Sequence, residues 1–369
     1  MSHRWIAERM QALDSSGIRK IFDLAAKMKS PVNLSIGQPD FDVPEPIRQA
    51  AIEAISSRKN GYSPTQGVGA LVEGLQSRVD AQYGHADRRA LVTSGTSGGL
   101  VLALLALVNP GDEVVVFDPY FVSYPALVEL AGGRPVLVDT YPSFKVDLDR
   151  LQAAITPRTK AIIFASPANP TGVTATEDEV RAIASLAAER GIALISDEIY
   201  ERFCYDAPFV SPARYNDQTI VVDGFSKTYA MTGWRLGFAH GPAEIVQEMG
   251  KLQQYTFVCA PQPMQWAGIA ALDVDMTAYI NTYRGKRDRL LAGLARDYDI
   301  VQPGGAFYAF PRVPRGTATE FVERAIAREL LIIPGKIFSR ADTHFRISYA
   351  ATDETIDRGV EILRGLARS

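Results

Sequence analysis

Residues 176–197 read TEDEVRAIASLAAERGIALISD, and this stretch joins a helix pattern to a strand pattern. Within Glu177–Arg190, small and apolar residues recur at helical spacing, at Val180, Ile183, Ala184 and Ala187. Thr176 has a side chain that commonly caps a helix N-terminus. Ile192–Ser196 is then almost continuously apolar, as expected of a strand covered on both faces. The stretch therefore predicts a helix that leads into a buried strand.

The same alternation extends from about Leu91 to His240. The short apolar runs that we expect to be strands are Leu91–Thr93, Glu113–Phe117, Pro135–Asp139, Ala161–Ala165, Ile192–Ser196, Thr219–Asp223 and Leu236–Ala239. Helical patterns lie between several of them, which favours a mostly parallel sheet flanked by helices. In such a sheet the ligand binds at the carboxyl ends of the strands. We therefore expect an α/β fold whose large domain contains a mostly parallel seven-stranded sheet.

A smaller α+β domain is expected after about Asp275, where the pattern changes. Its expected strands lie around Ala306–Phe310 and Phe345–Ser348, and its expected helices are Ala278 to about Ala295, Glu320–Glu329 and Asp353–Leu366. An N-terminal helix is expected beside them, with an apolar face formed by Ile18, Ile21, Phe22 and Ala25. The predicted division is a large domain of residues 42–274 and a small domain of residues 1–41 and 275–369.

Composition excludes several classes of protein. The 369 residues are 47% hydrophobic, and 39 basic against 42 acidic residues give no electrostatic reason to expect nucleic acid or an acidic membrane. Two cysteines are too few for a disulfide framework, and four scattered histidines lack metal-ligand spacing. The apolar stretch at the N-terminus is too short for a signal peptide, and the longest apolar run, Leu100 to Val108, is too short to span a membrane. We expect a cytoplasmic protein with no metal.

The run DGFSKTYAMTGWRLG, residues 223–237, places Lys227 among aromatic and apolar residues. Burial and nearby cations lower the pKa of a lysine, so that it becomes a neutral nucleophile able to condense with an aldehyde. Arg235 supplies a permanent cation suited to a phosphate. An isolated lysine is more often a solvent-exposed side chain. The amine and the guanidinium together indicate pyridoxal 5'-phosphate (PLP), which carries both an aldehyde and a phosphate.

This run resembles the Ser-Lys-x5-Gly-x-Arg signature of the class I/II aminotransferases, which are fold-type-I PLP enzymes. The resemblance extends from the Ile18-Arg19 segment to Arg346. It implies that the large domain binds PLP, that Lys227 holds PLP as a Schiff base, and that Arg235 binds the cofactor phosphate. It also implies a homodimer.

Asp197 follows the predicted strand Ile192–Ser196 and is therefore expected at the carboxyl edge of the sheet. A carboxylate there can pair with a protonated pyridine nitrogen and keep the ring an effective electron sink. The alternative is an N-cap for a predicted helix, Glu198–Phe203. Tyr200 lies on the same side of a helical turn as Asp197 and could reach the phenolic oxygen of the ring. The resemblance implies that both residues belong to the catalytic site.

Two more segments follow predicted strands and carry side chains suited to the cofactor ring. SPANPTG, residues 166–172, places an amide donor at Asn169, and its bond to Pro170 is a candidate cis peptide. DPYFVSY, residues 118–124, places an aromatic face at Phe121 that can stack on the ring. Taken alone, these are an ordinary turn and a core phenylalanine. The resemblance implies that both residues bind PLP and that Asn169 also contacts the substrate.

The segment TSGTSGG, residues 93–99, joins a predicted strand to a helix and offers backbone N–H groups and hydroxyls to an anion. It matches neither GxGxxG nor GxxxxGK, which counts against a nicotinamide or ATP site. The resemblance implies that three of its residues bind the cofactor phosphate, namely Gly95, Thr96 and Ser97. Many relatives have a serine where this chain has Gly224, and Ser226 is the candidate to compensate for it.

Three motifs concern the substrate and a second subunit. Gly37, in LSIGQPD (residues 34–40), resembles the family segment whose backbone meets the substrate carboxylate. Arg346, in FRISY (residues 345–349), matches the arginine that grips this carboxylate with two hydrogen bonds. Tyr62 resembles the tyrosine that reaches the cofactor phosphate of the neighbouring subunit. The active site is therefore expected to need a dimer.

The sequence predicts a PLP-dependent aminotransferase that moves an amino group between an L-amino acid and a 2-oxo acid. The nearest alternative is another reaction on the same scaffold, such as a C–S β-lyase or a cyclase that acts on S-adenosylmethionine. A PLP-binding transcription regulator would need a winged-helix domain, but only about 90 residues precede the phosphate loop. A nicotinamide dehydrogenase would need the missing GxGxxG. The substrate stays open, although Ile18, Phe121 and Tyr124 favour an apolar or aromatic pocket.

Overall fold

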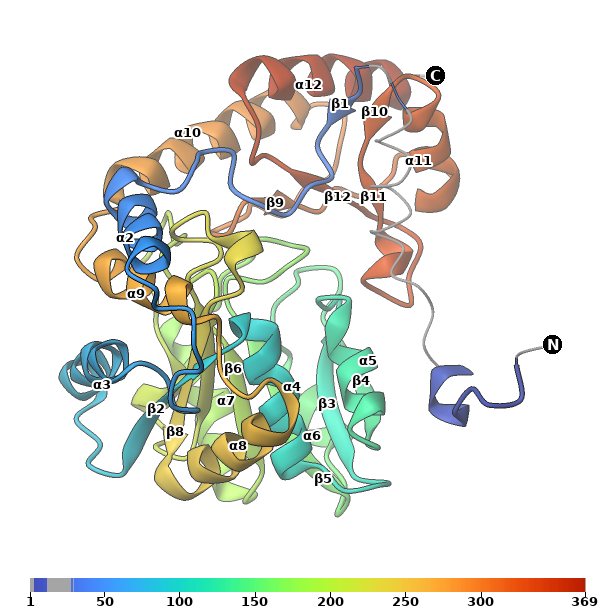
Figure 1. The fold of residues 1–369 in the computed structure, drawn as a ribbon. Helices are drawn as coiled ribbons and strands as arrows, with labels where there is room; N and C mark the ends of the chain where they lie inside the picture. The colour runs from blue at the N-terminus through green and yellow to red at the C-terminus, as the bar shows by residue number, and fades with distance from the viewer. Residues whose placement is uncertain (1–2, 12–27, 29, 369) are drawn as a thin grey trace.

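The computed structural model describes residues 3–11, 28 and 30–368, and a seven-stranded sheet forms its centre (Figure 1). The strands are β2 (Arg88–Thr93), β3 (Glu113–Asp118), β4 (Arg134–Asp139), β5 (Thr159–Ala165), β6 (Ala193–Asp197), β7 (Ile220–Gly224) and β8 (Gly237–Pro242). Their order is β2-β8-β7-β6-β5-β3-β4, and only β8 runs antiparallel to its neighbours. The predicted α/β fold with a mostly parallel seven-stranded sheet is confirmed.

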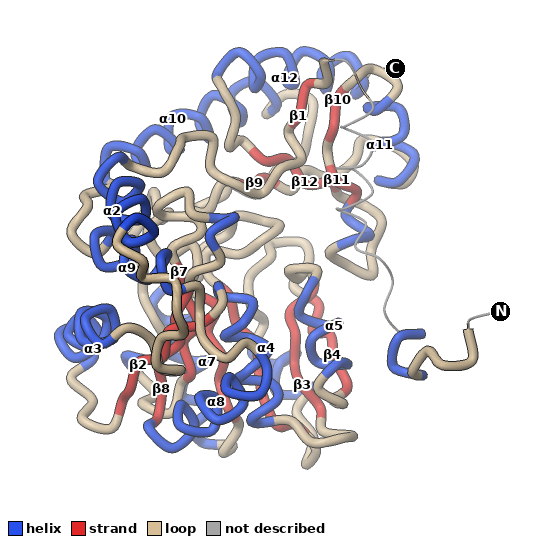
Figure 2. Tube along the Cα trace, viewed as in Figure 1, coloured by secondary structure: helices blue, strands red, loops and turns tan. Residues whose placement is uncertain are grey.

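Helices cover both faces of this sheet, which explains why its strands are apolar on both sides (Figure 2). The helices that pack on one face are α4 (Gly95–Leu107), α5 (Ser123–Leu130) and α8 (Ala243–Thr256). The helices α6 (Leu148–Ala154) and α7 (Glu177–Glu189) pack on the other. Within β3, Val114 and Val116 face the first group and Val115 faces the second. The predicted cap of α7 is present as a capping box between Thr176 and Glu179.

Three further helices flank the β2 side of the sheet: α2 (Glu45–Ser56), α3 (Gly69–Tyr83) and α9 (Gln262–Ala271). Their buried residues pack against Ala90 and Val92 of β2 and against Phe225. Because Phe225 stands two residues before Lys227, this packing fixes the start of the lysine segment.

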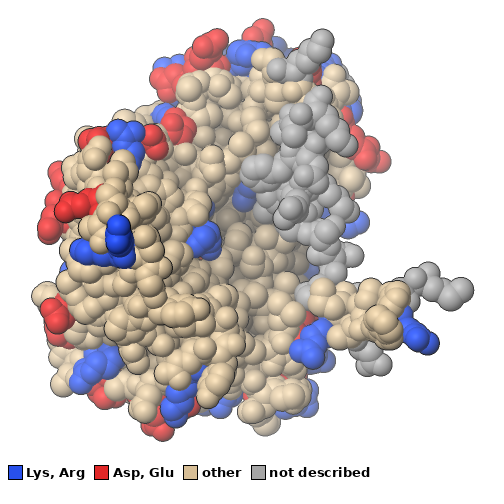
Figure 3. Space-filling model, viewed as in Figure 1, with Lys and Arg blue, Asp and Glu red and all other residues tan. Residues whose placement is uncertain are grey.

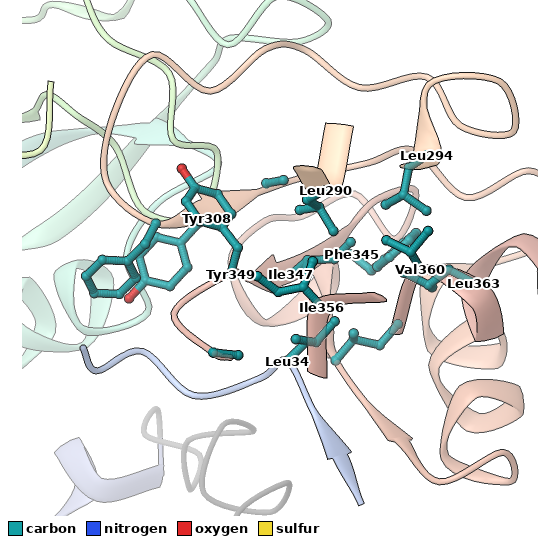
Figure 4. Close-up of a cluster of buried hydrophobic side chains, with 14 of the residues drawn as sticks. Leu34, Leu290, Leu294, Tyr308, Phe345, Ile347, Tyr349, Ile356, Val360 and Leu363 are labelled. Carbon is teal, nitrogen blue, oxygen red and sulfur yellow. The ribbon is translucent and has the colours of Figure 1, made fainter. Parts of the chain in front are cut away.

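A second group of elements lies above the large sheet in Figure 1 and includes the C-terminal part of the chain. It contains a three-stranded sheet, β11 (Ile333–Pro334), β12 (Phe345–Ser348) and β9 (Tyr308–Ala309), and a parallel pair, β1 (Val32–Asn33) and β10 (Leu330–Leu331). Its helices are α10 (Thr277–Leu294), α11 (Ala318–Ile326) and α12 (Asp353–Ala367). Figure 4 shows the buried cluster that joins these elements. The domain boundaries at residues 41/42 and 274/275 stay a prediction, and the predicted N-terminal helix falls outside the described residues.

The predicted helix Glu198–Phe203 is wrong, because this segment consists of turns. The backbone N–H of Glu198 still donates to Val222 O of the neighbouring strand (2.9 Å). At its other end, Phe203 O accepts from the N–H of Ala306 (2.9 Å). The local bonds within the segment are those of turns, from Glu201 N–H to Glu198 O and from Phe203 N–H to Tyr200 O (both 2.8 Å), while both ends of the segment bond to distant parts of the chain. Strand β9 is also shorter than the predicted run Ala306–Phe310.

The carboxyl ends of β5, β6 and β7 face the second group of elements, and the molecular surface is hollowed where the two parts meet (Figure 3). Acidic and basic side chains are interspersed on this face of the molecule. None of the helices in the described part of the chain has the length and apolar character that a membrane crossing requires.

Candidate active site

A cavity of about 290 Å³ lies at the carboxyl ends of β5, β6 and β7. It is lined by most of the predicted site residues: Gly37, Thr96, Ser97, Phe121, Asn169, Asp197, Tyr200, Ser226, Lys227, Arg235 and Arg346. These residues come from segments far apart in the sequence. Of the remaining predicted residues, Gly95 lies in the same loop as Thr96, whereas Tyr62 does not line the cavity and is 84% exposed.

Lys227 follows β7 and extends its amine into the cavity. Its Nζ donates a hydrogen bond to the carbonyl oxygen of Gly37, 2.5 Å away. Burial, with the charges of Arg346 and Arg235, lowers the pKa of Lys227 to about 8. A substantial fraction of this amine is therefore neutral near physiological pH and able to act as a nucleophile.

Asp197 ends β6 and is buried. Its carboxylate accepts hydrogen bonds from the Tyr124 hydroxyl (2.7 Å) and from the backbone N–H of Ile199 (3.3 Å). Burial raises the pKa of Asp197, while the bond from Tyr124 opposes this change. Because no helix follows Asp197, the helix-cap interpretation is wrong. Phe121 meets Tyr124 edge to face, with ring centroids 5.5 Å apart, and both rings line the cavity.

Arg346 lies on β12 and is buried. Its two terminal nitrogens donate to Asn169 Oδ1 (3.0 Å) and to Ser35 O (2.8 Å). Its Nε has no hydrogen-bond partner among the described residues. Asn169 is joined to Pro170 by a cis peptide bond, as the sequence predicts. A buried guanidinium with an unused donor at a cavity can bind a carboxylate.

The start of α4 forms a cradle for an anion. The helix begins at Gly95, and the side chain of its N-cap residue Ser94 accepts no hydrogen bond from the first backbone N–H groups of the helix. The buried Thr96 hydroxyl has no partner in the part of the chain that the structure describes. A Cβ at Gly95 would lie only 2.8 Å from Cζ of Arg235, so glycine lets this guanidinium reach the cradle. The donor set fits a phosphate.

Neighbouring atoms fill the space beside Gly224, where the family pattern led us to expect a serine. A Cβ at this position would lie 2.8 Å from Thr96 Oγ1 and 3.1 Å from Cα of Gly237. The Thr96 side chain thus occupies the room that a serine would need. Ser226, the residue expected to compensate, is buried and lines the same cavity.

Several residues of the cavity carry no signal in the sequence that identifies them. Tyr308 lines it, and its hydroxyl lies 2.8 Å from that of Tyr200. Gln38 and Thr232 also line it. Tyr308 stands in a predicted strand, and only its tertiary contacts distinguish it from a core aromatic residue. Ile18, predicted to line the pocket, lies outside the described residues.

Comparison with known proteins agrees with this geometry. The family model for aminotransferase class I and II matches residues 29–363. The probable aspartate aminotransferase of Methanocaldococcus jannaschii is 35% identical, and the match covers 97% of this chain and 99% of that protein. The aspartate/prephenate aminotransferase of Thermus thermophilus is 36% identical, with 97% of each chain covered. The solved structure of aspartate aminotransferase from Thermus thermophilus with maleate has a TM-score of 0.94 at 34% identity, covering 99% of this chain and 100% of that one.

Proposed function

The chain belongs to the aminotransferase class I and II family, and from this premise we propose that it transfers an amino group between an L-amino acid and a 2-oxo acid with PLP bound covalently to Lys227. The family uses PLP as its cofactor. The observation that carries the proposal is the Lys227 amine, which has a pKa of about 8 and extends into a cavity that also contains Arg235, Arg346 and Asp197. A nucleophile, two cations and a carboxylate thus surround one space.

The cavity residues suit the three polar parts of PLP. Bound PLP supplies a carbon that accepts the amino group and a ring that delocalises the electrons left on the substrate. The phosphate would be held by Arg235 and the cradle residues Gly95, Thr96, Ser97 and Ser226. Asp197 would pair with the ring nitrogen, Asn169 and Tyr200 would donate to the phenolic oxygen, and Phe121 would stack on the ring.

Lys227 would also move the proton during turnover. When it is not bound to the cofactor, the Lys227 amine would take the proton from Cα of the substrate and, as a general acid, deliver it to the carbon of the cofactor that carries the amino group. A pKa of about 8 lies close to that suited to both steps at neutral pH.

The α-carboxylate would bind to Arg346, with Asn169 and the backbone at Gly37 beside it. The Lys227 amine bonds to Gly37 O and Arg346 bonds to Asn169, so the proposed binding and reacting groups already contact one another. This geometry supports an amino acid oriented with its Cα towards Lys227.

We also propose a homodimer with shared active sites. Tyr62 is exposed, and so are Tyr255, Phe257 and Val258 near the end of α8. Gln253 of α8 donates to Thr65 O (2.6 Å), which ties this helix to the segment that contains Tyr62. Exposed apolar residues from joined segments support contact with a second subunit.

The test is the fate of a ¹⁵N-labelled donor amino group. The purified protein, loaded with PLP, is given a panel of labelled amino acids with 2-oxoglutarate, oxaloacetate or pyruvate. Transfer predicts that ¹⁵N appears in the amino acid made from the 2-oxo acid, with little free ammonia. Cystathionine alone provides the contrasting assay, because release of pyruvate and ammonia from it would indicate a C–S β-lyase instead. The Lys227→Ala variant is the control.

A further inference from the structure

Tyr308 lies where the two groups of elements meet at the cavity. It belongs to β9, is 1% exposed, and pairs in register with Ser348 of β12. Arg346 is two residues before Ser348 and therefore lies on the same face of β12. Arg346 is thus the diagonal neighbour of Tyr308 across the strand pair. Figure 4 shows Tyr308 at one end of the buried cluster.

The ring of Tyr308 contacts the guanidinium of Arg346. Cζ of Arg346 lies 4.5 Å from the ring centroid of Tyr308 and 4.7 Å from that of Phe338. Two aromatic faces thus restrain the orientation of a buried arginine whose terminal nitrogens bond to Asn169 and Ser35.

The hydroxyl of Tyr308 contacts Tyr200, which also lines the cavity. It lies 2.8 Å from the Tyr200 hydroxyl, and the two rings meet nearly perpendicularly, at 85°. A Cβ at Gly37 would lie only 2.6 Å from the same hydroxyl, so the Gly37 backbone packs directly on it. Gly37 O in turn accepts the bond from Lys227.

We propose that Tyr308 is a positioning residue with two separable roles, in which its ring orients Arg346 for the substrate carboxylate and its hydroxyl orients Tyr200 towards the phenolic oxygen of PLP. This inference rests on the proposed function. Either hydroxyl of this 2.8 Å pair could be the donor. In the proposed arrangement the Tyr308 hydroxyl donates to the Tyr200 oxygen, which leaves the Tyr200 proton free for the cofactor.

The hydroxyl role is tested by absorbance of the PLP-loaded protein as pH changes, without turnover. A donor to the phenolic oxygen stabilises its anionic form, so a weaker donor makes the cofactor more basic. Tyr308→Phe should raise the pH midpoint of the absorbance change by about 0.5–1 unit, as expected for one lost hydrogen bond. The same substitution in a Tyr200→Phe protein should add no further shift.

The matched control is Tyr349→Phe. Tyr349 is fully buried in the same cluster, and its hydroxyl donates to Ala306 O (3.2 Å) and does not line the cavity. Like Tyr308→Phe, the Tyr349→Phe substitution removes one buried hydroxyl, but it should leave the pH midpoint of the absorbance change as in wild type. A Tyr308→Phe midpoint equal to that of wild type and Tyr349→Phe would overturn the hydroxyl role. If the wild-type protein bound no PLP at all, the proposed function would fail instead.

The ring role is tested with 3-phenylpropionate, a carboxylate that has no amino group to react. Tyr308→Phe keeps the ring and should bind it within about twofold of wild type, whereas Tyr308→Leu should bind it roughly three- to thirtyfold more weakly, as expected for a lost cation–π contact. Equal binding by both variants would overturn the ring role. Should Tyr308→Leu fail to fold, Phe338→Leu removes the other ring that contacts Arg346, and undiminished binding by that folded variant would likewise count against aromatic positioning.

Discussion

The chemistry of the site depends on how a few charged side chains alter one another. Lys227 is kept partly neutral by burial and by the cations Arg346 and Arg235, while burial raises the pKa of Asp197. The same cations serve two proposed ligands, the substrate carboxylate and the cofactor phosphate. Binding these anions would offset part of the positive charge around Lys227. The charges in the cavity thus couple the binding of these anions to the protonation state of the Lys227 amine.

The pKa of Lys227 predicts how the cofactor-free protein takes up PLP. Because this pKa is lowered to about 8, the amine is protonated below that pH and neutral above it. The rate of covalent uptake should rise about tenfold per pH unit well below pH 8 and level off above it, as followed by stopped-flow absorbance. Arg346→Gln should move the midpoint upward by removing a nearby cation. A wild-type rate that still rose steeply above pH 9 would contradict the lowered pKa.

Arg346→Lys separates substrate binding from cofactor binding. Lysine cannot reproduce the planar guanidinium fork, so kcat/KM should fall by about 2–4 kcal/mol of transition-state stabilisation, on the order of thirty- to a thousandfold. PLP and its colour should remain. Steady-state assays should show a similar loss for every amino donor, because all share the α-carboxylate. Damage confined to one class of donor would mean that Arg346 contacts the side chain instead.

At the residue scale, the sequence predicted the groups that stand at motif positions but missed the contacts between them. Asp197, Asn169, Lys227 and Arg346 follow strands or stand in recognisable runs, and they do meet at one cavity. The bond from Tyr124 to Asp197 spans 73 residues and has no local signal. Tyr308 was likewise missed, since its importance depends on strand register.

At the element scale, strands with continuous apolar runs were predictable because both faces of the sheet are covered. The segment Glu198–Phe203 was mispredicted because its backbone bonds to Val222 and Ala306, which no local pattern reveals. The loop of residues 93–99, between β2 and α4, was predicted as an anion site from its backbone N–H groups and hydroxyls at a helix N-terminus. The close packing of this loop against Gly237 was not predicted, because it depends on the pairing of β8 with β2.

Gly237→Ala tests this packing. An added Cβ would lie 2.5 Å from the carbonyl carbon of Gly95 and 2.6 Å from the backbone nitrogen of Thr96, so the phosphate loop must shift. Affinity for PLP should fall about five- to a hundredfold, as expected for about 1–3 kcal/mol of overpacking. Fluorescence titration of the cofactor-free protein with PLP measures this affinity. Gly250→Ala is the control, because a Cβ there meets open space. Wild-type affinity in Gly237→Ala would show that the loop tolerates the shift.

At the scale of the whole molecule, the cavity lies between two groups of elements, and residues from both line it. Gly37, Tyr308 and Arg346 come from one group, and Asp197 and Lys227 come from the other. Composition and periodicity predicted both groups, but not their relative placement. Tyr62 is exposed and does not line the cavity of its own chain. Its proposed contact with the cofactor phosphate would therefore be made in the cavity of a second subunit.

Hybrid dimers test whether the active site is shared. Lys227→Ala chains and Tyr62→Ala chains should each have little activity alone. A hybrid contains one site with an intact Lys227 and an intact Tyr62 from the other chain, so mixing should restore up to about half of the wild-type activity per dimer. Differently tagged chains allow the hybrid to be purified before assay. Verified hybrids with no recovered activity would argue against a site built from two chains.

The most direct test of covalent PLP binding at Lys227 is to identify the lysine that carries the cofactor. Borohydride reduction of the PLP-loaded protein fixes the cofactor on its lysine, and peptide mass spectrometry then locates the label. We predict one label per chain, on Lys227, because it is the one lysine among the described residues that lines the cavity, together with Arg235, Asp197 and Arg346. A label on another lysine, or none on the PLP-loaded protein, would contradict the account.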